Sequence, residues 1–306
     1  MYDVIALGEL LVDLAERAKD ENGYPTLAAN PGGAPGNFLA ALSAYGKKTA
    51  FLAKVGDDTF GHLLTGTMRR AGIDTRGILI SSDTFTTLAF VTFDAHGDRS
   101  FAFARKPGAD TQLRWEEIDP AMLAESRVFH FGSLSCTDEP ARTATQKAAA
   151  YARMHGKLVT YDPNYRANLW KNKEDAIAQM KAPLPLVDIL KVSDEELPLL
   201  TGTTDCESGT AQLAQNGIRL IFVTLGANGV FYRFGEKTGH VAGVPCKVGD
   251  TNGAGDTFFG AALSKLCKEE LDTLTVDKLE GILAFANKAA SITTSRHGAI
   301  PAMPTL

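Results

Sequence analysis

The chain has 306 residues, of which 44% are hydrophobic and 22% are charged, and its net charge at pH 7 is -5. This length suffices for one large α/β domain or two smaller ones, and the composition is typical of a soluble globular protein. The acidic balance, without a basic block, gives no general attraction to nucleic acid or to an anionic membrane.

The start of the chain and its cysteines predict a cytoplasmic protein. The first apolar run lacks a basic segment before it and is interrupted by Glu9 and Asp13, so we expect no signal peptide. No run reaches the roughly 20 apolar residues that a membrane span needs. The cysteines are far apart and form no CxxC pair: Cys136, Cys206, Cys246 and Cys267. They predict neither a zinc site nor a disulfide framework, which fits a reducing compartment.

A short strand is predicted at residues 4–7, where an apolar run ends at Gly8. Asp13 follows soon after this strand. Ligands in open α/β sheets bind near the carboxyl ends of the strands, so Asp13 is a candidate ligand contact. The alternative is a solvated acid in a loop, which is the simpler interpretation of one acidic residue.

The next segment, residues 31–37, reads PGGAPGN and precedes a predicted helix at 38–45. The paired glycines Gly32 and Gly33 allow the backbone to approach a ligand closely. Asn37, at the start of the helix, can either cap the helix or face that ligand.

A predicted β-hairpin stands apart from the alternation of strands and helices. Residues 85–93 and 100–105 are rich in β-branched and aromatic residues, and the turn residues 94–98 separate them. We expect an antiparallel hairpin that forms a flap outside the main sheet. Arg105 at its end is a candidate contact for an anion or a hydroxyl group, or otherwise a surface charge.

Elsewhere strands alternate with helices, which predicts a mainly parallel, doubly wound sheet in one α/β domain over residues 1–306. The predicted strands are 50–55, 128–131, 158–161, 189–192 and 220–225, with short edge strands at 230–233 and 239–244. The predicted helices are 59–71, 139–155, 257–266 and 279–294, with two more that begin at Asp194 and Ser208. We find no internal repeat and no interdomain linker.

Residues 193–196 read SDEE and fit a capping box, in which Ser193 caps the following helix and Glu196 reaches back to the strand end. In the functional alternative, Glu196 holds a hydrated metal ion.

The stretch from Gly249 to Phe259 reads GDTNGAGDTFF and places a glycine turn directly before a helix. The first N–H groups of a helix have no partner within it, and glycines let them approach a bound anion closely. Asp256 would then lie beside the anion as a potential base. The alternative is a glycine turn whose acidic residue only stabilises the helix dipole.

Several other kinds of site are excluded because the sequence lacks their motifs. The sequence has no GxxxxGK[ST] phosphate loop, no protein-kinase motif set, no HExxH and no GxSxG. The dinucleotide fingerprint fails because Phe258 occupies the position of its third glycine. Asp256 would also place negative charge near the pyrophosphate.

Two separated stretches together resemble one family. Residues 32–37, GGAPGN, and the Ala/Leu-rich helix after them resemble the N-terminal signature of the ribokinase-like (PfkB) carbohydrate kinases. Residues 250–256, DTNGAGD, resemble the family's C-terminal signature, usually DTTGAGD. Asn252 departs from that pattern but leaves both acids and the amide loop in place. The resemblance covers essentially the whole chain.

Landmarks between the two signatures agree with this resemblance. Residues 224–229, TLGANG, look like the family's adenine-side turn, and residues 193–196 stand where the family usually has N-x-x-E, with serine in place of asparagine. Within the family, Arg105, the DPNYR run at 162–166 and the KVSDEE run at 191–196 look most like fructokinases. Ribokinases and ketodeoxygluconate kinases are the near neighbours.

The resemblance implies transfer of the γ-phosphoryl group of ATP to a sugar, here to the 6-hydroxyl of fructose, with Mg²⁺ and, as a further expectation, K⁺. It implies Asp256 as the general base and the amides of Gly253, Ala254 and Gly255 as an anion hole. The implied sugar-binding residues are Asp13, Gly32, Gly33, Asn37, Arg105 and Arg166. The implied nucleotide-side residues are Lys191, Ser193, Thr224, Gly226, Gly229 and Asn287.

The resemblance also implies cation sites and an assembly. Glu196 would hold Mg²⁺ through water, and Asp250 and Asn252, with the loop at 295–298, would hold a monovalent cation. A β-sheet lid built from about residues 10–30 and 83–106 would close over the sugar and mediate a homodimer. The implied ligands are a small sugar and ATP, with no nucleic acid and no membrane.

Two functions of other classes stay open. A nicotinamide-dependent oxidoreductase could use residues 253–255, but it needs a ribose-binding acid on a strand about 20 residues further on. Residues 268–272 instead predict the end of a helix and an acidic loop. A non-catalytic sugar- or nucleotide-binding protein is the second alternative, and it would have no need of Asp256.

Overall fold

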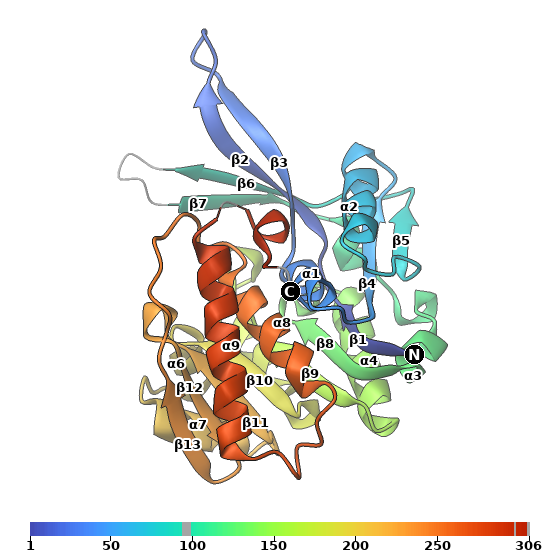
Figure 1. The fold of residues 1–306 in the computed structure, drawn as a ribbon. Coiled ribbons are helices and arrows are strands. Elements are labelled where there is room, and N and C mark those ends of the chain that lie inside the picture. The colour runs from blue at the N-terminus through green and yellow to red at the C-terminus, as the bar shows by residue number, and fades with distance from the viewer. Residues whose placement is uncertain (94–98, 297, 305–306) are drawn as a thin grey trace.

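The computed structural model of the chain describes residues 1–93, 99–296 and 298–304, and it shows a large sheet between two layers of helices (Figure 1). Within these residues the sheet has nine strands, in the order β13-β12-β11-β10-β9-β8-β1-β4-β5. The strands are β1 Tyr2–Leu7, β4 Thr49–Gly56, β5 Ile78–Ser81, β8 Ser126–Gly132, β9 Leu158–Asp162, β10 Ile189–Ser193, β11 Leu220–Thr224, β12 Val230–Phe234 and β13 Lys237–Val241. The strands from β11 to β5 pair in parallel, and β12 and β13 add an antiparallel edge. The predicted mainly parallel α/β fold is confirmed.

The two layers of helices follow from the alternation of side chains along the strands. On β1, Val4 and Ala6 point into one core, and Ile5 and Leu7 point into the other. The first core lies against α1 Ala34–Ala44, α2 Thr59–Arg70, α8 Ala254–Leu266 and α9 Val276–Thr294. The second lies against α3 Pro120–Ala124, α4 Ala141–Met154, α5 Lys173–Lys181, α6 Glu196–Thr201 and α7 Cys206–Ala214. In the described part of the chain, no helix combines the length and the apolar character needed to cross a membrane.

Helices α1 and α8 begin earlier than the sequence predicted. Helix α1 starts at Ala34 because Pro35 in its first turn already has the φ angle that a helix requires. Helix α8 starts at Ala254, directly after Gly253, whose φ of 75° lies in the left-handed region that favours glycine. The glycine turn is therefore the first turn of the helix itself.

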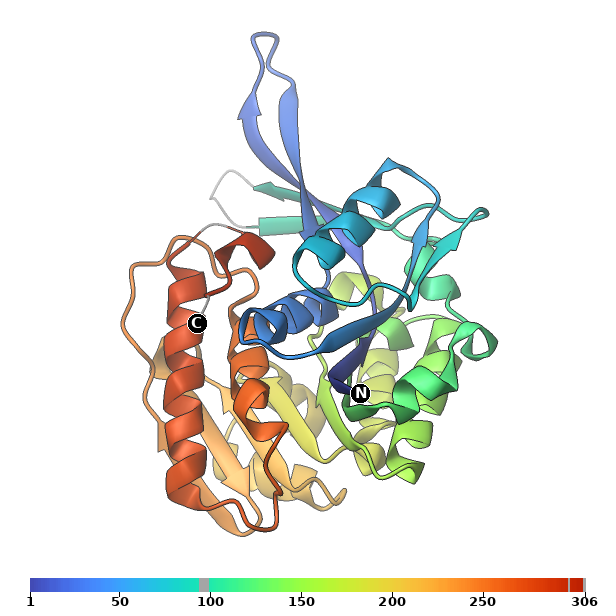
Figure 2. The same cartoon turned by 45° about the vertical axis from the view of Figure 1, so that its right-hand side comes forward.

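A second, smaller sheet lies beside the main one (Figure 2). It has the order β3-β2-β6-β7, with β2 Leu11–Lys19, β3 Pro25–Gly32, β6 Leu88–Phe93 and β7 Arg99–Ala104. Strands β6 and β7 form the antiparallel hairpin that the sequence predicted, and its turn at 94–98 lies outside the described residues. The hairpin of β2 and β3 was not predicted from residue patterns, and only the family resemblance implied it, as part of the β-sheet lid at about residues 10–30. It joins β6 through parallel pairing with β2. The small sheet is confirmed, whereas its closure as a lid stays a prediction.

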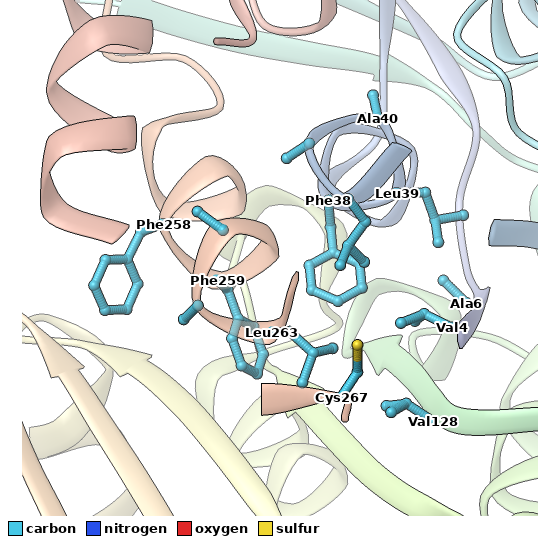
Figure 3. Close-up of a cluster of buried hydrophobic side chains, with 14 of the residues drawn as sticks. Val4, Ala6, Phe38, Leu39, Ala40, Val128, Phe258, Phe259, Leu263 and Cys267 are labelled. Carbon is cyan, nitrogen blue, oxygen red and sulfur yellow. The ribbon is translucent and has the colours of Figure 1, made fainter. Parts of the chain in front are cut away.

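Helix α8 lies directly on α1 because Gly260 has no side chain. A Cβ atom at this position would come within 2.8 Å of the Cβ atom of Ala41 and 2.9 Å of the carbonyl oxygen of Phe38. Next to this contact, the rings of Phe38 and Phe259 meet in the core with their centroids 5.5 Å apart (Figure 3). The ring of Phe38 also stacks on His130 of β8. This core holds the first turns of the two helices side by side.

We expect Gly260→Ala to lower the free energy of unfolding by about 1–3 kcal/mol, because the added methyl group must push the two helices apart. Gly281→Ala in α9 is the matched control, since a Cβ atom there meets nothing within 4 Å. That control should raise stability by about 0.5–1 kcal/mol. Urea denaturation of both variants measures the difference. Equal stability of Gly260→Ala and the unsubstituted protein would contradict the close contact.

Candidate active site

The first turn of α8 presents Asp256 to a cavity of about 430 Å³. The small sheet, the start of α1, the segment after β9 and the segment before α8 all contribute to its walls. The residues predicted from the sequence that line it are Asp13, Gly33, Asn37, Arg166, Asp250, Asn252 and Asp256. The structure thus brings both glycine signatures, which lie near opposite ends of the chain, to one cavity.

The Asp256 carboxylate is held by two side-chain amides. Asn37 Nδ2 donates to Oδ2 at 2.9 Å, and Asn164 Nδ2 lies 3.4 Å from Oδ1. The side chain of Asp256 is buried, and this burial raises the pKa of its carboxyl group above the ordinary value. The hydrogen bond from Asn37 and the charges of Lys191 and Arg166 act in the opposite direction. A carboxylate that stays ionised while its pKa rises is a stronger base.

A buried ion pair lies behind the first turn of α8. Lys191 Nζ bonds both carboxylate oxygens of Asp162, at 2.9 Å and 3.2 Å. It also comes so close to the turn that a Cβ atom on Gly255 would lie 3.1 Å away from it. Burial alone would lower the pKa of the Lys191 ammonium, but the carboxylates of Asp162 and Glu196 raise it above the ordinary value. The ammonium therefore keeps its positive charge beneath the amides of the turn.

Glu9 is a buried acid in the cavity wall that sequence reasoning missed. Its Oε1 accepts the backbone N–H of Ala34 at 2.9 Å, and its Oε2 is buried without a hydrogen-bond partner in the described part of the chain. Burial raises the pKa of this carboxyl group to about 7. In the sequence, Glu9 was noted only as an acid that interrupts an apolar run. Its position just after a predicted buried strand was the signal that could have identified it.

Asn30 and Asn164 are two further cavity residues that the sequence did not single out. Asn30 lies on β3 and donates to the backbone oxygens of Ala28 and Asp13. Asn164 belongs to the loop at 162–166, of which only Arg166 was singled out. Asn30 owes its place to the β2–β3 hairpin, in which it pairs with Asp13. Asn164 lies in the DPNYR run, which the resemblance to fructokinases included without assigning a role to this asparagine.

Arg105 does not line the cavity. Its side chain is buried, and it donates to Asp110 at 2.8 Å, to Thr137 at 2.8 Å and to the carbonyl oxygen of Leu134 at 2.8 Å. Leu134 lines the cavity, so Arg105 supports the wall from behind. A direct contact between Arg105 and a sugar stays a prediction.

The glycines of the N-terminal signature leave room for site groups. A Cβ atom on Gly33, whose φ is 108°, would lie 2.5 Å from the carbonyl oxygen of Glu9. A Cβ atom on Gly32 would lie 2.5 Å from Oδ2 of Asp13. Side chains at these two positions would therefore displace the groups that form the cavity.

None of the predicted nucleotide-side residues lines this cavity. Lys191 lies behind the first turn of α8, and the others lie around the carboxyl ends of β10 and β11. Asn287 on α9 donates to the backbone oxygens of Val241 and Ala242, at 3.1 Å and 2.9 Å. Thr224 ends β11, and Gly226 and Gly229 form the turn after it with positive φ angles. A nucleotide contact at these positions stays a prediction.

The capping box at the start of α6 is confirmed. Ser193 N–H donates to Glu196 Oε2 at 2.8 Å, and Glu196 N–H donates to Ser193 Oγ at 3.1 Å. The other oxygen of Glu196 accepts the N–H of Tyr165 at 2.7 Å. Both oxygens of Glu196 are thus engaged by backbone donors, and any Mg²⁺ would have to interact through water and the remaining lone pairs.

The residues predicted for a monovalent cation lie together before α8. Asp250 Oδ1 accepts the N–H of Asn252 at 2.9 Å, and Oδ2 accepts the N–H of Gly298 at 3.2 Å. These bonds join the segment before α8 to the loop after α9, in which residue 297 lies outside the described residues. In the described part of the chain, no group of three or more His, Cys, Asp or Glu side chains could hold a metal ion by itself.

Comparisons with known proteins identify relatives over the whole chain. The model of the pfkB family of carbohydrate kinases matches residues 1–306. The chain is 40% identical to probable fructokinase-2 of Arabidopsis thaliana over 308 residues, which cover 99% of this chain and 93% of that protein.

Two solved structures are similar to this one. The first is fructokinase with bound ATP from Xylella fastidiosa, with a TM-score of 0.93 and 32% identity, covering 100% of this chain and 96% of that one. The second is a double-mutant fructokinase from Vibrio cholerae O395 in its fructose, ADP and potassium ion bound form. Its TM-score is 0.88 with 30% identity, covering 99% of this chain and 95% of that one.

We expect Glu9→Gln to remove a decline of stability with pH. The pKa of Glu9 is about 7 in the folded chain against 4.5 as its ordinary value, so the folded state binds more protons between these pH values. Stability is therefore lost as pH rises from about 4.5 to 7, by up to about 3 kcal/mol. Glutamine keeps an oxygen for Ala34 N–H without ionising. Urea denaturation at pH 5 and pH 8 gives the free energy of unfolding of both proteins. The same change with pH in both proteins would contradict the raised pKa of Glu9.

Proposed function

Because the chain belongs to the pfkB family of carbohydrate kinases, we propose that it is an ATP-dependent fructokinase, which converts ATP and D-fructose to ADP and D-fructose 6-phosphate. The similarity over whole chains to fructokinases, one with bound ATP and one with fructose and ADP, supports this choice. A carbohydrate kinase accounts for both glycine signatures and for Asp256, the acid that lines the cavity.

The observation that carries the proposal is the position of Asp256. Its carboxylate is buried in the first turn of α8, beside a cavity that Asp13 and Asn37 also line. The N–H groups of a first helical turn lack helical acceptors, and the dipole of the helix favours negative charge there. A base and an anion site therefore adjoin a cavity with polar walls, as transfer of a phosphoryl group to a hydroxyl requires.

In the proposed reaction the 6-hydroxyl oxygen of fructose attacks the γ-phosphorus of ATP. The new oxygen–phosphorus bond forms as the bond between the γ-phosphorus and the bridging oxygen breaks, and ADP takes the released electron pair. Asp256 accepts the hydroxyl proton. The amides of Gly253, Ala254, Gly255 and Asp256 stabilise the charge on the phosphoryl oxygens, and one well-placed donor of this kind contributes about 3–4 kcal/mol.

The remaining site residues then divide between the two substrates. Asp13, Gly33 and Asn37 bind sugar hydroxyls, and Arg166 faces the transferred phosphate. Arg105 would reach the sugar only if its bonds to Asp110 and Leu134 opened. The nucleotide lies along Lys191, Ser193, Thr224, Gly226, Gly229 and Asn287.

Two cations belong to the proposal. Glu196 would hold Mg²⁺ through water, and the bound ion would supply positive charge that offsets the charge of the phosphates. K⁺ would bind near Asp250 and Asn252. The potassium ion bound form of the similar Vibrio cholerae fructokinase supports the choice of this cation.

The small sheet is proposed to close over the sugar. Closure excludes water, which would otherwise compete for the phosphoryl group. The outer part of the small sheet exposes Tyr24 and Leu27, which supports a homodimer through this sheet.

The structure gives no support to the oxidoreductase alternative. After α8 the described chain passes through a loop into α9, which begins at Val276. No described strand follows the glycines at the place where a ribose-binding acid would have to lie.

A coupled ADP-release assay tests the choice of sugar. Over fructose, ribose, ketodeoxygluconate, tagatose and nucleosides, we expect the highest kcat/KM for fructose. A comparable value for another sugar would remove the fructokinase assignment and leave the kinase assignment in place. Bound ligand without any ADP release would instead favour the non-catalytic alternative.

We expect Asp256→Asn to lower kcat by roughly 100- to 10,000-fold with little change in KM, because general-base catalysis contributes that much. The matched control is Asp277→Asn, which removes an exposed acid from the first turn of α9, outside the site. It should keep kcat. Steady-state kinetics and a melting curve for each variant provide the comparison, and a near-normal kcat for Asp256→Asn would refute its role as base.

A further inference from the structure

We propose that Asn164 is a positioning residue that, together with Asn37, fixes the orientation of the Asp256 carboxylate. This inference rests on the proposed role of Asp256 as the base. The two amides approach different oxygens of the carboxylate, Asn37 at Oδ2 with 2.9 Å and Asn164 at Oδ1 with 3.4 Å. Two donors on two oxygens restrict rotation about the Cβ–Cγ bond, which one donor alone does not.

Asn37 on its own is a weak anchor. Its Oδ1 is buried and has no hydrogen-bond partner within the described residues, so only one end of its amide is held. The amide must present nitrogen to Asp256, because a carboxylate can only accept. A second donor is therefore needed to fix the plane of the carboxylate, and Asn164 occupies that position.

The backbone at Asn164 is adapted to this task. Among the described residues other than glycine, Asn164 alone has a positive φ, at 47°. Asparagine tolerates this left-handed region better than most residues, but the conformation persists only where the surroundings impose it. A strained backbone that aims a polar side chain at a buried carboxylate is typical of a functional position.

The neighbours of Asn164 are fixed on both sides. The carbonyl oxygen of Pro163 accepts from the N–H of Ser133 at 3.1 Å and from its Oγ at 2.5 Å. The N–H of Tyr165 donates to Glu196 at 2.7 Å. Glu196 is itself held by the capping box of α6. The loop is thus tied to the ends of β8 and β10, and it delivers the Asn164 amide at a defined place.

Several charges also act on Asp256 and would continue to act without Asn164. Lys191 on β10 and Arg166 after β9 stabilise its ionised form, and Glu196 on α6 disfavours it. Asp162 at the end of β9 is a further acid nearby and is paired with Lys191. Other acids line the same cavity as Asp256, among them Glu9, Asp13 and Asp250. Asn164 is distinct from these because it offers a directed hydrogen bond and carries no charge. Its removal therefore changes orientation and one hydrogen bond, while the charges stay.

Asn164→Gly is the informative variant, because it removes the amide and glycine adopts a φ of 47° without strain. We expect kcat for fructose to fall about tenfold, the size of one hydrogen bond to a charged group, while KM stays within about twofold. The acid limb of the kcat pH profile should move to higher pH, because the lost donor favoured the ionised form. Asn164→Ala should show the same kinetic change with a lower melting temperature.

The matched control is Asn172→Ala. Asn172 caps α5 by accepting the N–H of Asp175 at 2.7 Å and does not line the cavity. This variant should lower the melting temperature and leave kcat, KM and the pH profile unchanged.

A readout without turnover separates this inference from the proposed function. Carboxyl ¹³C NMR follows the titration of Asp256 directly, and the spectrum of Asp256→Asn identifies its resonance. We expect a higher pKa in Asn164→Gly whichever sugar the enzyme uses. An unchanged titration, or an unchanged kcat, would overturn the inference. So would a raised KM with unchanged kcat, which would make Asn164 a sugar contact instead.

Discussion

Helix α8 lies against α1 at a separation that a side chain at Gly260 would prevent, and the geometry of the site depends on this contact. It sets the Asp256 carboxylate 2.9 Å from the amide of Asn37, across a sequence separation of 219 residues. The rings of Phe38 and Phe259 secure the same contact from within the core. Phe38 and Phe259 each lie within three positions of the proposed site residue on the same helix, so the same few turns set the packing of the core and the geometry of the site.

Around this contact the protein buries several acids, which opposes folding but serves the proposed chemistry. Four buried acids lie near it, and only some of them have groups that offset the cost of burying their charge: Asp256, Asp162, Glu196 and Glu9. Lys191 neutralises Asp162, and backbone N–H groups satisfy Glu196. Glu9 keeps an oxygen without a partner in the described chain, so burial shifts it towards its protonated form. A buried charge that lacks its partner costs stability, and such costs are characteristic of functional sites.

The fold followed from local patterns to a large extent. Alternating strands and helices predicted the parallel sheet, and the SDEE run predicted the cap of α6 that the structure confirms. The starts of α1 and α8 were placed three to four residues late, since glycine and proline at 33–36 and 253–255 look like loop residues. Proline and glycine are compatible with a first helical turn, where the N–H groups have no helical acceptor. The hairpin of β2 and β3 was expected only from the family resemblance, as part of the lid, because its outer half is exposed and lacks a continuous apolar face.

The sequence by itself determined the family resemblance, the glycine positions and the identity of the proposed base, because these depend on residue types at short, fixed spacings. The tertiary structure decided which groups meet. It placed Arg105 behind the cavity wall with Asp110, paired Lys191 with Asp162, and brought Asn164 to Asp256. The contacts of Lys191 and of Asn164 join segments that are 29 and 92 positions apart in the chain. Hydrogen bonds and ion pairs depend on separations of about 3 Å, which only the packing of the sheet and its helices sets.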